Sequence, residues 1–200
     1  AGLGSGLETF SLPLTDEAIP AYYLIATAEA SANLARYDGI QYGYRPDDAE
    51  VRDLSDFYCK ARTAGFGREV RRRILLGTFA LSSGYYEAYY QKALKVRRMI
   101  SDSFRRALGR YDMLLIPTSP STAPRLGESL DDPLKMYLSD IYTVTANLAG
   151  LPALALPCGF DKAGLPIGFQ LIGRAFEDAL LLNAGMAFQK MTGHHQKRPE

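Results

Sequence analysis

The sequence predicts an α/β fold in which a mixed β-sheet is flanked by helices. Apolar residues recur at helical spacing from Tyr85 to Leu108, and Tyr111–Thr118 is a short continuous apolar run. Two more strand-like runs, Pro152–Phe160 and Pro166–Arg174, are separated by a sequence typical of a hairpin turn. Strands interspersed with helices in this way indicate an α/β domain.

The N-terminal part of the chain is predicted to be mainly helical. Leu7–Leu12 contains phenylalanine and threonine and predicts a first strand. Ile19–Leu34 is rich in alanine and predicts a helix, with Thr15 and Asp16 as its N-terminal signal. Glycines then mark Arg36–Gly43 as a turn.

Three helices are predicted in the middle of the chain. Val51–Thr63 and Gly67–Leu81 predict the first two, and Ser82-Ser83-Gly84 bends or ends the second. The third is long, and its apolar residues recur every three or four positions, so that they share one helical face. That face is formed by Tyr85, Tyr89, Ala93, Val96, Ile100, Phe104 and Leu108.

The C-terminal part contains the predicted sheet. Ser119–Pro133 is a proline-rich loop without a regular period. Asp140–Ala149 predicts a short helix, because Gly150 supplies the usual stop signal. Phe176–Met191 predicts a closing amphipathic helix, and residues 193–200 predict a flexible tail.

Composition is that of an ordinary soluble domain. The chain has 200 residues, of which 47% are hydrophobic and 22% charged, and its formal net charge is +1. Such a balance gives no electrostatic reason to expect a protein that coats nucleic acid or binds a membrane surface. The cysteines, Cys59 and Cys158, do not form a CxxC pair. Without a membrane span or a cleavable leader, these features predict a reducing compartment, the cytoplasm.

A search for catalytic motifs finds none that is convincing. HExxH, GxSxG, a Walker loop and GxGxxG after a strand are all missing from the sequence. His194 and His195 lie in the polar tail. Ser82 and Ser83 lack a flanking glycine cluster that could hold an oxyanion, so a helix break is the simpler interpretation.

Five long blocks of sequence are distinctive: PAYYLIATAEASANLARYDGIQYGYR, GFGREVRRRILLGTFALSSGYYEAYYQKALKVR, YDMLLIPTSPSTAPRLGE, DDPLKMYLSDIYTVTANLAGLPALALPCGF and GLPIGFQLIGRAFEDALLL. Together they resemble the amidase signature family, and in particular its tRNA-dependent amidotransferase A subunits, from about Glu8 to Met191. The blocks NLAGLPA and LPIGFQLIG recur across that family, whereas NLARYDGIQYG and ALSSGYYEAYY point to the tRNA-dependent branch.

The resemblance implies the C-terminal half of the amidase signature fold, with residues 1–200 forming part of one amidase domain. In that branch of the family, glutamine is hydrolysed by a serine, a cis-bonded serine and a lysine, and the ammonia amidates Glu-tRNA(Gln) or Asp-tRNA(Asn). Those catalytic segments have no counterpart here, so no catalytic residue is assigned, and the chain alone is expected to be inactive. The implied partners are the B subunit, which uses ATP and Mg²⁺, and a small C subunit. No cofactor or metal is expected in this chain.

The resemblance also implies three substrate-binding residues. Arg73 would hold the α-carboxylate of glutamine, since a guanidinium offers two parallel donors to two oxygens. Asp140 would accept from the α-ammonium group, and Tyr22 would line the pocket. Gly77 and Ala80 share the helical face of Arg73, which predicts room for a ligand there.

Each of these residues also has a plainer interpretation. Arg73 belongs to the basic run Arg71-Arg72-Arg73, which is typical of a solvated helix face. Asp140 stands where a helix begins and is suited to an N-cap. Tyr22 adjoins Tyr23 on an apolar helix, where core packing is the usual role.

Two other functions stay open on the sequence. One is a different amidase signature hydrolase that acts on a small amide, for which the pair Arg73 and Asp140 would have no purpose. The other is a noncatalytic binding or assembly module. The long helix also carries a basic set that could face tRNA or a partner, although a solvated face is the simpler interpretation: Lys92, Lys95, Arg97, Arg98, Arg105, Arg106 and Arg110.

Overall fold

A computed structural model describes residues 4, 6–13, 15–47, 51–127 and 138–198. The chain divides into two compact units. The first unit comprises Ala1–Ile19 and Val96–Glu200, and the second unit comprises Pro20–Lys95. Helices α1 and α4 each contribute residues to both units. No helix among the described residues is long and apolar enough to cross a membrane.

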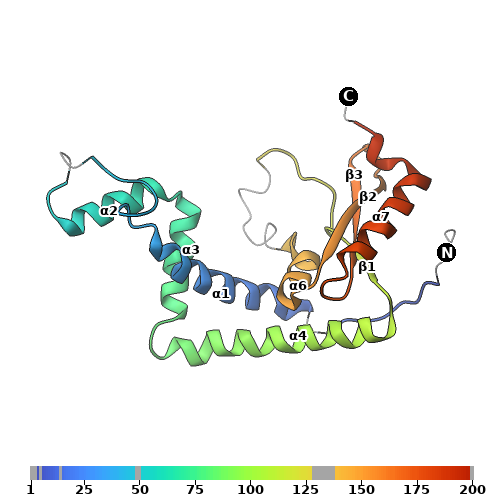
Figure 1. Ribbon diagram of the computed structural model, residues 1–200, viewed down its shortest axis with the longest axis horizontal. Coiled ribbons are helices and arrows are strands. Elements are labelled where there is room, and N and C mark those ends of the chain that lie inside the picture. Colours follow the sequence, from blue (N-terminus) through green and yellow to red (C-terminus); the bar gives the residue numbers. More distant parts are fainter. Residues whose placement is uncertain (1–3, 5, 14, 48–50, 128–137, 199–200) are drawn as a thin grey trace. The chain divides into compact units, whose positions relative to one another are not determined.

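The second unit is helical (Figure 1). It contains most of α1 (Thr15–Asn33), the short 3-10 helix η1 (Leu34–Arg36), α2 (Leu54–Gly65) and α3 (Arg68–Ala80). The helices predicted at Ile19–Leu34, Val51–Thr63 and Gly67–Leu81 are therefore confirmed, with small differences at their ends. Helix α1 begins about one turn earlier than predicted and includes Pro20.

Two aspartate side chains accept backbone hydrogen bonds at the start of helix α2. The side chain of Asp53 accepts from the N–H of Asp56 at 2.9 Å, and the Asp56 carboxylate accepts from the N–H of Arg52 at 3.0 Å. That bond, together with the side chains of Arg52 and Lys60, lowers the pKa of Asp56 to about 2. These contacts stabilise the ionised carboxylate at the helix N-terminus.

The lowered pKa gives a pH prediction with a definite sign. The stabilisation from Asp56 is complete above its unfolded pKa of 3.8 and is lost as the pH falls from that value through about 2. A carboxyl NMR titration should therefore place the Asp56 midpoint near 2. A midpoint near 3.8 would mean that these hydrogen bonds do not form. Asp56→Asn should remove this part of the acid dependence of stability.

The long helix begins with a π-helical turn, η3 (Tyr86–Tyr90), and continues as α4 (Gln91–Arg110). The break predicted at Ser82–Gly84 is confirmed. The predicted apolar face is buried at Ala93, Ile100, Phe104 and Leu108. Tyr85 and Tyr89 are exposed instead, because a π turn contains more residues per turn and shifts the helical phase.

The first unit contains a three-stranded sheet with the order β1-β3-β2. Its strands are β1 (Leu114–Pro117), β2 (Ala153–Phe160) and β3 (Pro166–Ile172). The hairpin of β2 and β3 is confirmed. Both pairings among the described residues are antiparallel, so the sheet in this part of the fold is antiparallel and not mixed as predicted. A strand at Leu7–Leu12 was wrongly predicted, since the structure assigns no strand there. That segment is instead attached through side chains, because Glu8 pairs with Arg110 and Phe10 contacts Tyr111.

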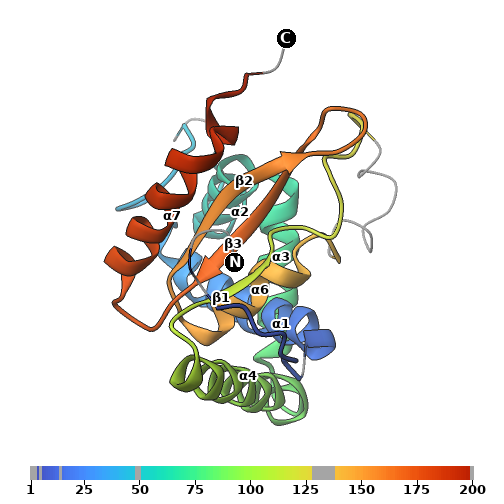
Figure 2. The same cartoon turned by 90° about the vertical axis from the view of Figure 1, so that its right-hand side faces the viewer.

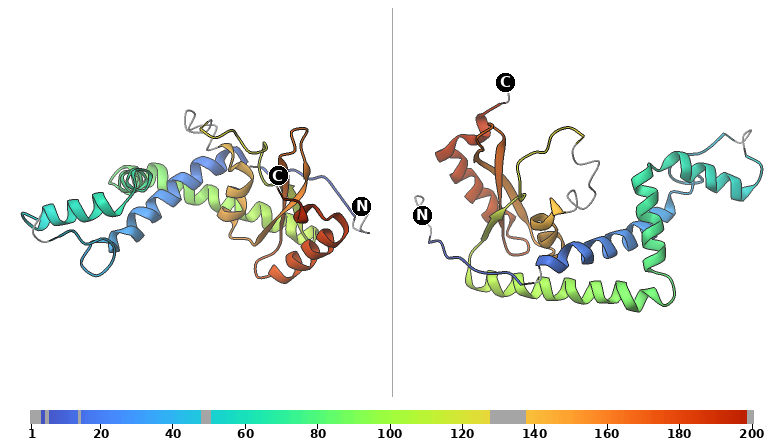
Figure 3. Two further views of the ribbon diagram at one scale, coloured as in Figure 1. Left: turned by 90° about the horizontal axis from the view of Figure 1, so that it is seen from above. Right: turned by 180° about the vertical axis from the view of Figure 1, so that it is seen from behind.

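Helices cover both faces of this sheet. Helix α7 (Asp178–Thr192) lies beside β2 and β3 in both views of Figure 3, where Leu156, Phe169, Leu171 and Leu181 form a buried cluster. Helix α6 (Ile141–Ala149) lies on the other face (Figure 2). The Gln170 side chain of β3 donates to the Tyr142 carbonyl of this helix at 3.2 Å. Gly150 ends α6 with a φ of 70°, as the sequence predicted.

Two predicted segments are only partly described by the structure. The loop predicted at Ser119–Pro133 contains no helix or strand as far as residue 127, and its remainder lies outside the described residues. The segment predicted as a tail forms the 3-10 helix η4 (His194–Gln196), which contacts β2, and its residues 199–200 likewise lie outside the described part.

Phe176, in the turn before α7, holds a strained backbone conformation. Its φ is 67°, the one positive value among the described non-glycine residues, and its side chain is 97% exposed. Such a φ is unfavourable for a bulky residue. Arg174 fixes this turn, because its guanidinium donates to the carbonyls of Leu108 at 2.9 Å and Tyr111 at 3.2 Å.

Phe176→Gly should therefore stabilise the chain. Glycine removes a strain of about 1–2 kcal/mol but adds about 0.5–1 kcal/mol of unfolded-state flexibility, so we expect a net gain of roughly 0.5–1 kcal/mol. Phe176→Ala is the matched control, because it removes the ring and keeps the Cβ atom. Urea unfolding should show a gain for glycine and almost none for alanine. Equal effects would show that the backbone is not strained.

Candidate functional site

Arg73 lies in the middle of α3, and its guanidinium is held on two sides. Its Nε atom donates to Glu69 Oε1 at 3.0 Å, one helical turn earlier, and its Cζ atom lies 5.9 Å from the centre of the Tyr23 ring. The bond from Glu69 raises the pKa of Arg73 most, with smaller contributions from Tyr22 and Tyr23. Across the described ranges, neither Nη atom of Arg73 makes a hydrogen bond. The two Nη groups therefore present a free edge suited to a carboxylate.

Tyr22 belongs to the same group of side chains. Its ring packs edge to face against the ring of Tyr23, with the centroids 5.3 Å apart. Both tyrosines are half-buried on α1. Because Tyr23 packs against Tyr22 and lies under Arg73, the second unit brings together two of the three substrate-binding residues predicted from the sequence.

The small residues of α3 do not leave space for a ligand, so that part of the sequence interpretation was wrong. Gly77 and Ala80 are buried. A Cβ atom on Gly77 would lie 1.9 Å from the carbonyl oxygen of Thr27, which belongs to α1. The space beside Gly77 is thus filled by the backbone of α1. This close helix crossing holds α3 against the helix that carries Tyr22 and Tyr23.

Asp140 occupies the N-cap position of α6, as the sequence predicted, but its side chain makes no capping bond. Its backbone carbonyl begins the helix by accepting from the N–H groups of Thr143 and Val144. The exposed carboxylate lies at the edge of a cavity of about 860 Å³ in the first unit. Asp140 is therefore available to a ligand. It belongs to the first unit, whereas Tyr22 and Arg73 belong to the second.

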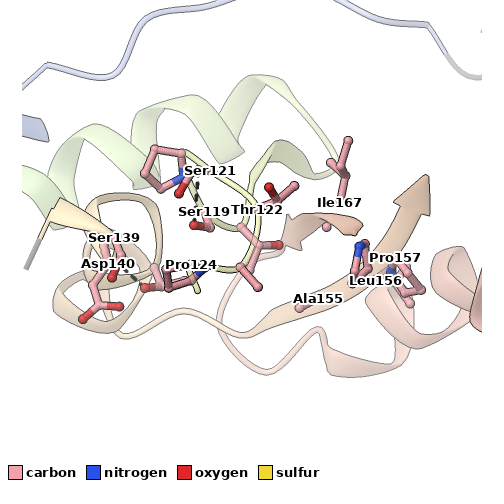
Figure 4. A pocket seen from close by; sticks show the side chains of 16 residues that line it. Ser119, Ser121, Thr122, Pro124, Ser139, Asp140, Ala155, Leu156, Pro157 and Ile167 are labelled. Carbon is pink, nitrogen blue, oxygen red and sulfur yellow. Dashed lines mark hydrogen bonds between the residues drawn. The ribbon is translucent and has the colours of Figure 1, made fainter. Parts of the chain in front are cut away.

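The cavity is lined by many side-chain hydroxyl groups. Figure 4 shows the loop from Ser119 to Pro124 crossing it, with Asp140 near one end and Leu156 of β2 near the other. The hydroxyl residues are Thr118, Ser119, Ser121, Thr122, Ser139 and Thr143. Prolines and aliphatic side chains such as Leu156 and Ile167 line the rest, so the cavity is mainly apolar with several hydroxyl groups that can donate or accept.

Thr118 is the residue of this cavity that sequence reasoning missed. Its Oγ1 atom is buried and makes no hydrogen bond to any described residue. It lies beside Gly168, where a Cβ atom would approach it to 3.2 Å. A buried hydroxyl without a partner is unusual and marks a position that a ligand or a water molecule could satisfy. Periodicity could not have found it, because the loop after Thr118 has no regular period.

The side chains of His194 and Ser82, two candidates for catalytic or metal-binding roles, have structural roles in the described ranges. No cluster of three or more metal-binding side chains is found there. The His194 ring packs near Phe160 and Phe188, with centroids 6.2 and 6.5 Å away, so it takes part in packing. The Ser82 hydroxyl donates to the Phe79 carbonyl at 2.7 Å and thereby ends α3.

The chain is similar to known proteins of one family. A family model described as Amidase matches residues 1–182. The A subunit of the glutamyl-tRNA(Gln) amidotransferase of Moorella thermoacetica is 58% identical over 99% of this chain, and that of Brevibacillus brevis is 52% identical over the same share. The chain spans about 40% of the length of each of these relatives.

Solved structures show the same relationship. The A subunit of the glutamyl-tRNA(Gln) amidotransferase of Thermotoga maritima is 44% identical, with a TM-score of 0.63 over 92% of this chain and 34% of that one. A 6-aminohexanoate cyclic dimer hydrolase, 17% identical, has a TM-score of 0.69 over 100% of this chain and 40% of its own, and this likeness concerns the fold alone.

Proposed function

Because the chain belongs to the amidase family, we propose that it is the C-terminal, substrate-binding part of the glutamine-hydrolysing A subunit of an amidotransferase. The predicted fold, a part of the amidase signature fold, is confirmed by its structural neighbours. The proposed reaction converts Glu-tRNA(Gln), or Asp-tRNA(Asn), to the amide form in the cytoplasm. The bond-breaking groups would lie in the part of the A subunit that this chain does not span.

The free Nη edge of Arg73 is the observation that carries the proposal. A free amino acid has a carboxylate that needs a fixed cation and an ammonium group that needs a fixed anion. Arg73 supplies the cation, with one edge held by Glu69 and the other edge open toward every residue that the structure describes. Asp140 supplies an exposed anion that is not used in helix capping. A hydrolase for an uncharged small amide would need neither charge.

The other partners in the proposed reaction follow from the resemblance. A B subunit would use ATP and Mg²⁺ to activate the misacylated tRNA, and a C subunit would complete the assembly. In this chain we assign Tyr22, Arg73 and Asp140 to glutamine binding and no residue to bond cleavage.

A reconstituted assay tests the proposal. A complete A subunit that carries this chain, combined with B and C subunits, ATP and Mg²⁺, should form Gln-tRNA(Gln) or Asn-tRNA(Asn) with glutamine as the amide donor. The 200-residue chain alone should release no ammonia from glutamine above a blank. Failure of the complete assembly to use glutamine, or ammonia release by the chain alone, would contradict the proposal.

A further inference from the structure

We infer that Glu69 is a positioning residue that fixes the guanidinium of Arg73 so that its two Nη groups face the carboxylate of the substrate. This inference rests on the proposed function, because it assumes that Arg73 binds that carboxylate. Glu69 would act through Arg73 and would not contact the substrate.

A flexible arginine side chain loses rotamer entropy when it is fixed, so a site that fixes it in advance binds its ligand more tightly. Glu69 lies one turn before Arg73 on α3, and its Oε1 atom accepts from Nε at 3.0 Å. Since a guanidinium is planar, a bond at Nε leaves the Nη edge facing the other way.

The carboxylate of Glu69 is itself held in place by Arg72. Arg72 donates to both carboxylate oxygens of Glu69, from Nε at 2.9 Å and from Nη2 at 2.9 Å. This bidentate pair fixes the plane of the carboxylate, which can then orient Arg73. The bonds from Arg72 and then Arg73 lower the pKa of Glu69, so it remains ionised at neutral pH. Arg72 thus has a definite role, which is to hold Glu69.

This cluster differs from an ordinary surface ion pair. Exposed pairs between neighbouring turns contribute little, and Arg105 with Asp102 on α4 is such a pair. The two carboxylates are similarly exposed, at 49% for Glu69 and 45% for Asp102, so the difference lies in the arginine. The Arg73 side chain is 38% exposed, against 73% for Arg105, and its guanidinium also lies over the Tyr23 ring. Among the described residues, Glu69 on one edge and Tyr23 on one face leave the Nη edge as the free part of the group.

The test measures carboxylate discrimination in a complete A subunit that carries this chain. Discrimination is the Kd of 4-aminobutanamide, which is glutamine without its α-carboxylate, divided by the Kd of L-glutamine, both from calorimetry. Arg73→Ala should reduce this ratio to near one. Glu69→Gln should reduce it by about 3- to 10-fold, the size of one typical hydrogen bond, while the Kd of 4-aminobutanamide stays within about twofold.

Control variants distinguish failure of the Glu69 inference from failure of the proposed function. Asp102→Asn removes a carboxylate from a comparable ion pair and should leave both Kd values unchanged. If Arg73→Ala lowers the ratio but Glu69→Gln leaves it at the wild-type value, the positioning role is overturned and the proposed function stands. If Glu69→Gln weakens both ligands equally, its role is structural and the inference fails. If Arg73→Ala leaves the ratio unchanged, the proposed function itself fails.

Discussion

Gly77→Ala is expected to destabilise the chain by about 3 kcal/mol or more, a large effect for the addition of one methyl group. The new Cβ atom would lie 1.9 Å from the Thr27 carbonyl oxygen and 2.5 Å from its carbon. Both are backbone atoms, so no rotamer change can relieve the overlap, and α3 must move away from α1. Denaturant unfolding followed by circular dichroism would measure the loss.

Gly109→Ala is the matched control for this prediction. Gly109 also lies inside a helix, α4, but nothing lies within 4 Å of the position that its Cβ atom would take. Alanine favours the helix over glycine, so this variant should gain up to about 1 kcal/mol. If Gly77→Ala were also neutral or stabilising, α1 and α3 could not cross as closely as described. Tyr23 would then not lie under Arg73.

Arg73→Ala in a complete A subunit is expected to lower kcat/KM for glutamine by about 100- to 1,000-fold, since truncating one member of a hydrogen-bonded charge pair costs about 2–5 kcal/mol. Most of the change should appear in KM, because the α-carboxylate is bound in the ground state as well as in the transition state. Arg73→Lys should recover only part of the loss, because an ammonium group cannot form the planar fork. Steady-state ammonia release would provide the measurement.

Arg71→Ala tests whether charge alone explains such a loss. Arg71 is an exposed residue of the same basic run. Replacing it by alanine removes one positive charge, as Arg73→Ala does. If Arg73 acts through its specific contacts, Arg71→Ala should leave kcat/KM within about twofold of wild type, as for an exposed charge screened by salt. Equal losses for the two variants would indicate a general electrostatic effect and no carboxylate site at Arg73.

Helical periodicity was the most reliable guide to the fold, and its failures have physical causes. Ala93, Ile100, Phe104 and Leu108 are buried as their spacing predicted. Tyr85 and Tyr89 follow the same spacing but are exposed, because the π turn rotates their side chains away from the buried face of the helix. No simple sequence pattern predicts a π turn.

Strand formation was harder to predict than helix formation. A strand needs a partner that supplies hydrogen bonds, whereas a helix satisfies its own backbone. Pro152–Phe160 and Pro166–Arg174 were correctly predicted as strands because the turn between them makes each the partner of the other. Leu7–Leu12 has suitable residues but no partner strand in the part of the chain that the structure describes.

Tyr22, Arg73 and Asp140 were assigned to the site from the family resemblance, whereas residue spacing alone could identify site residues only where they are close in sequence. Glu69 precedes Arg73 by four positions, so the helical rule for neighbouring side chains could have found this pair. The cavity near Asp140 could not be found in that way, since it joins the loop after β1, the start of α6 and the strands β2 and β3. The room beside Gly77 was misjudged, because a row of small residues fits a close helix as well as a ligand.

A crystal structure of the complete A subunit with bound L-glutamine would show which groups hold the charged ends of the amino acid. We expect the Nη atoms of Arg73 to lie within about 3 Å of the α-carboxylate oxygens, and an Asp140 oxygen to lie within about 3 Å of the α-ammonium nitrogen. A glutamine molecule whose carboxylate is bound by other groups, with Arg73 and Asp140 both turned toward solvent, would contradict this expectation.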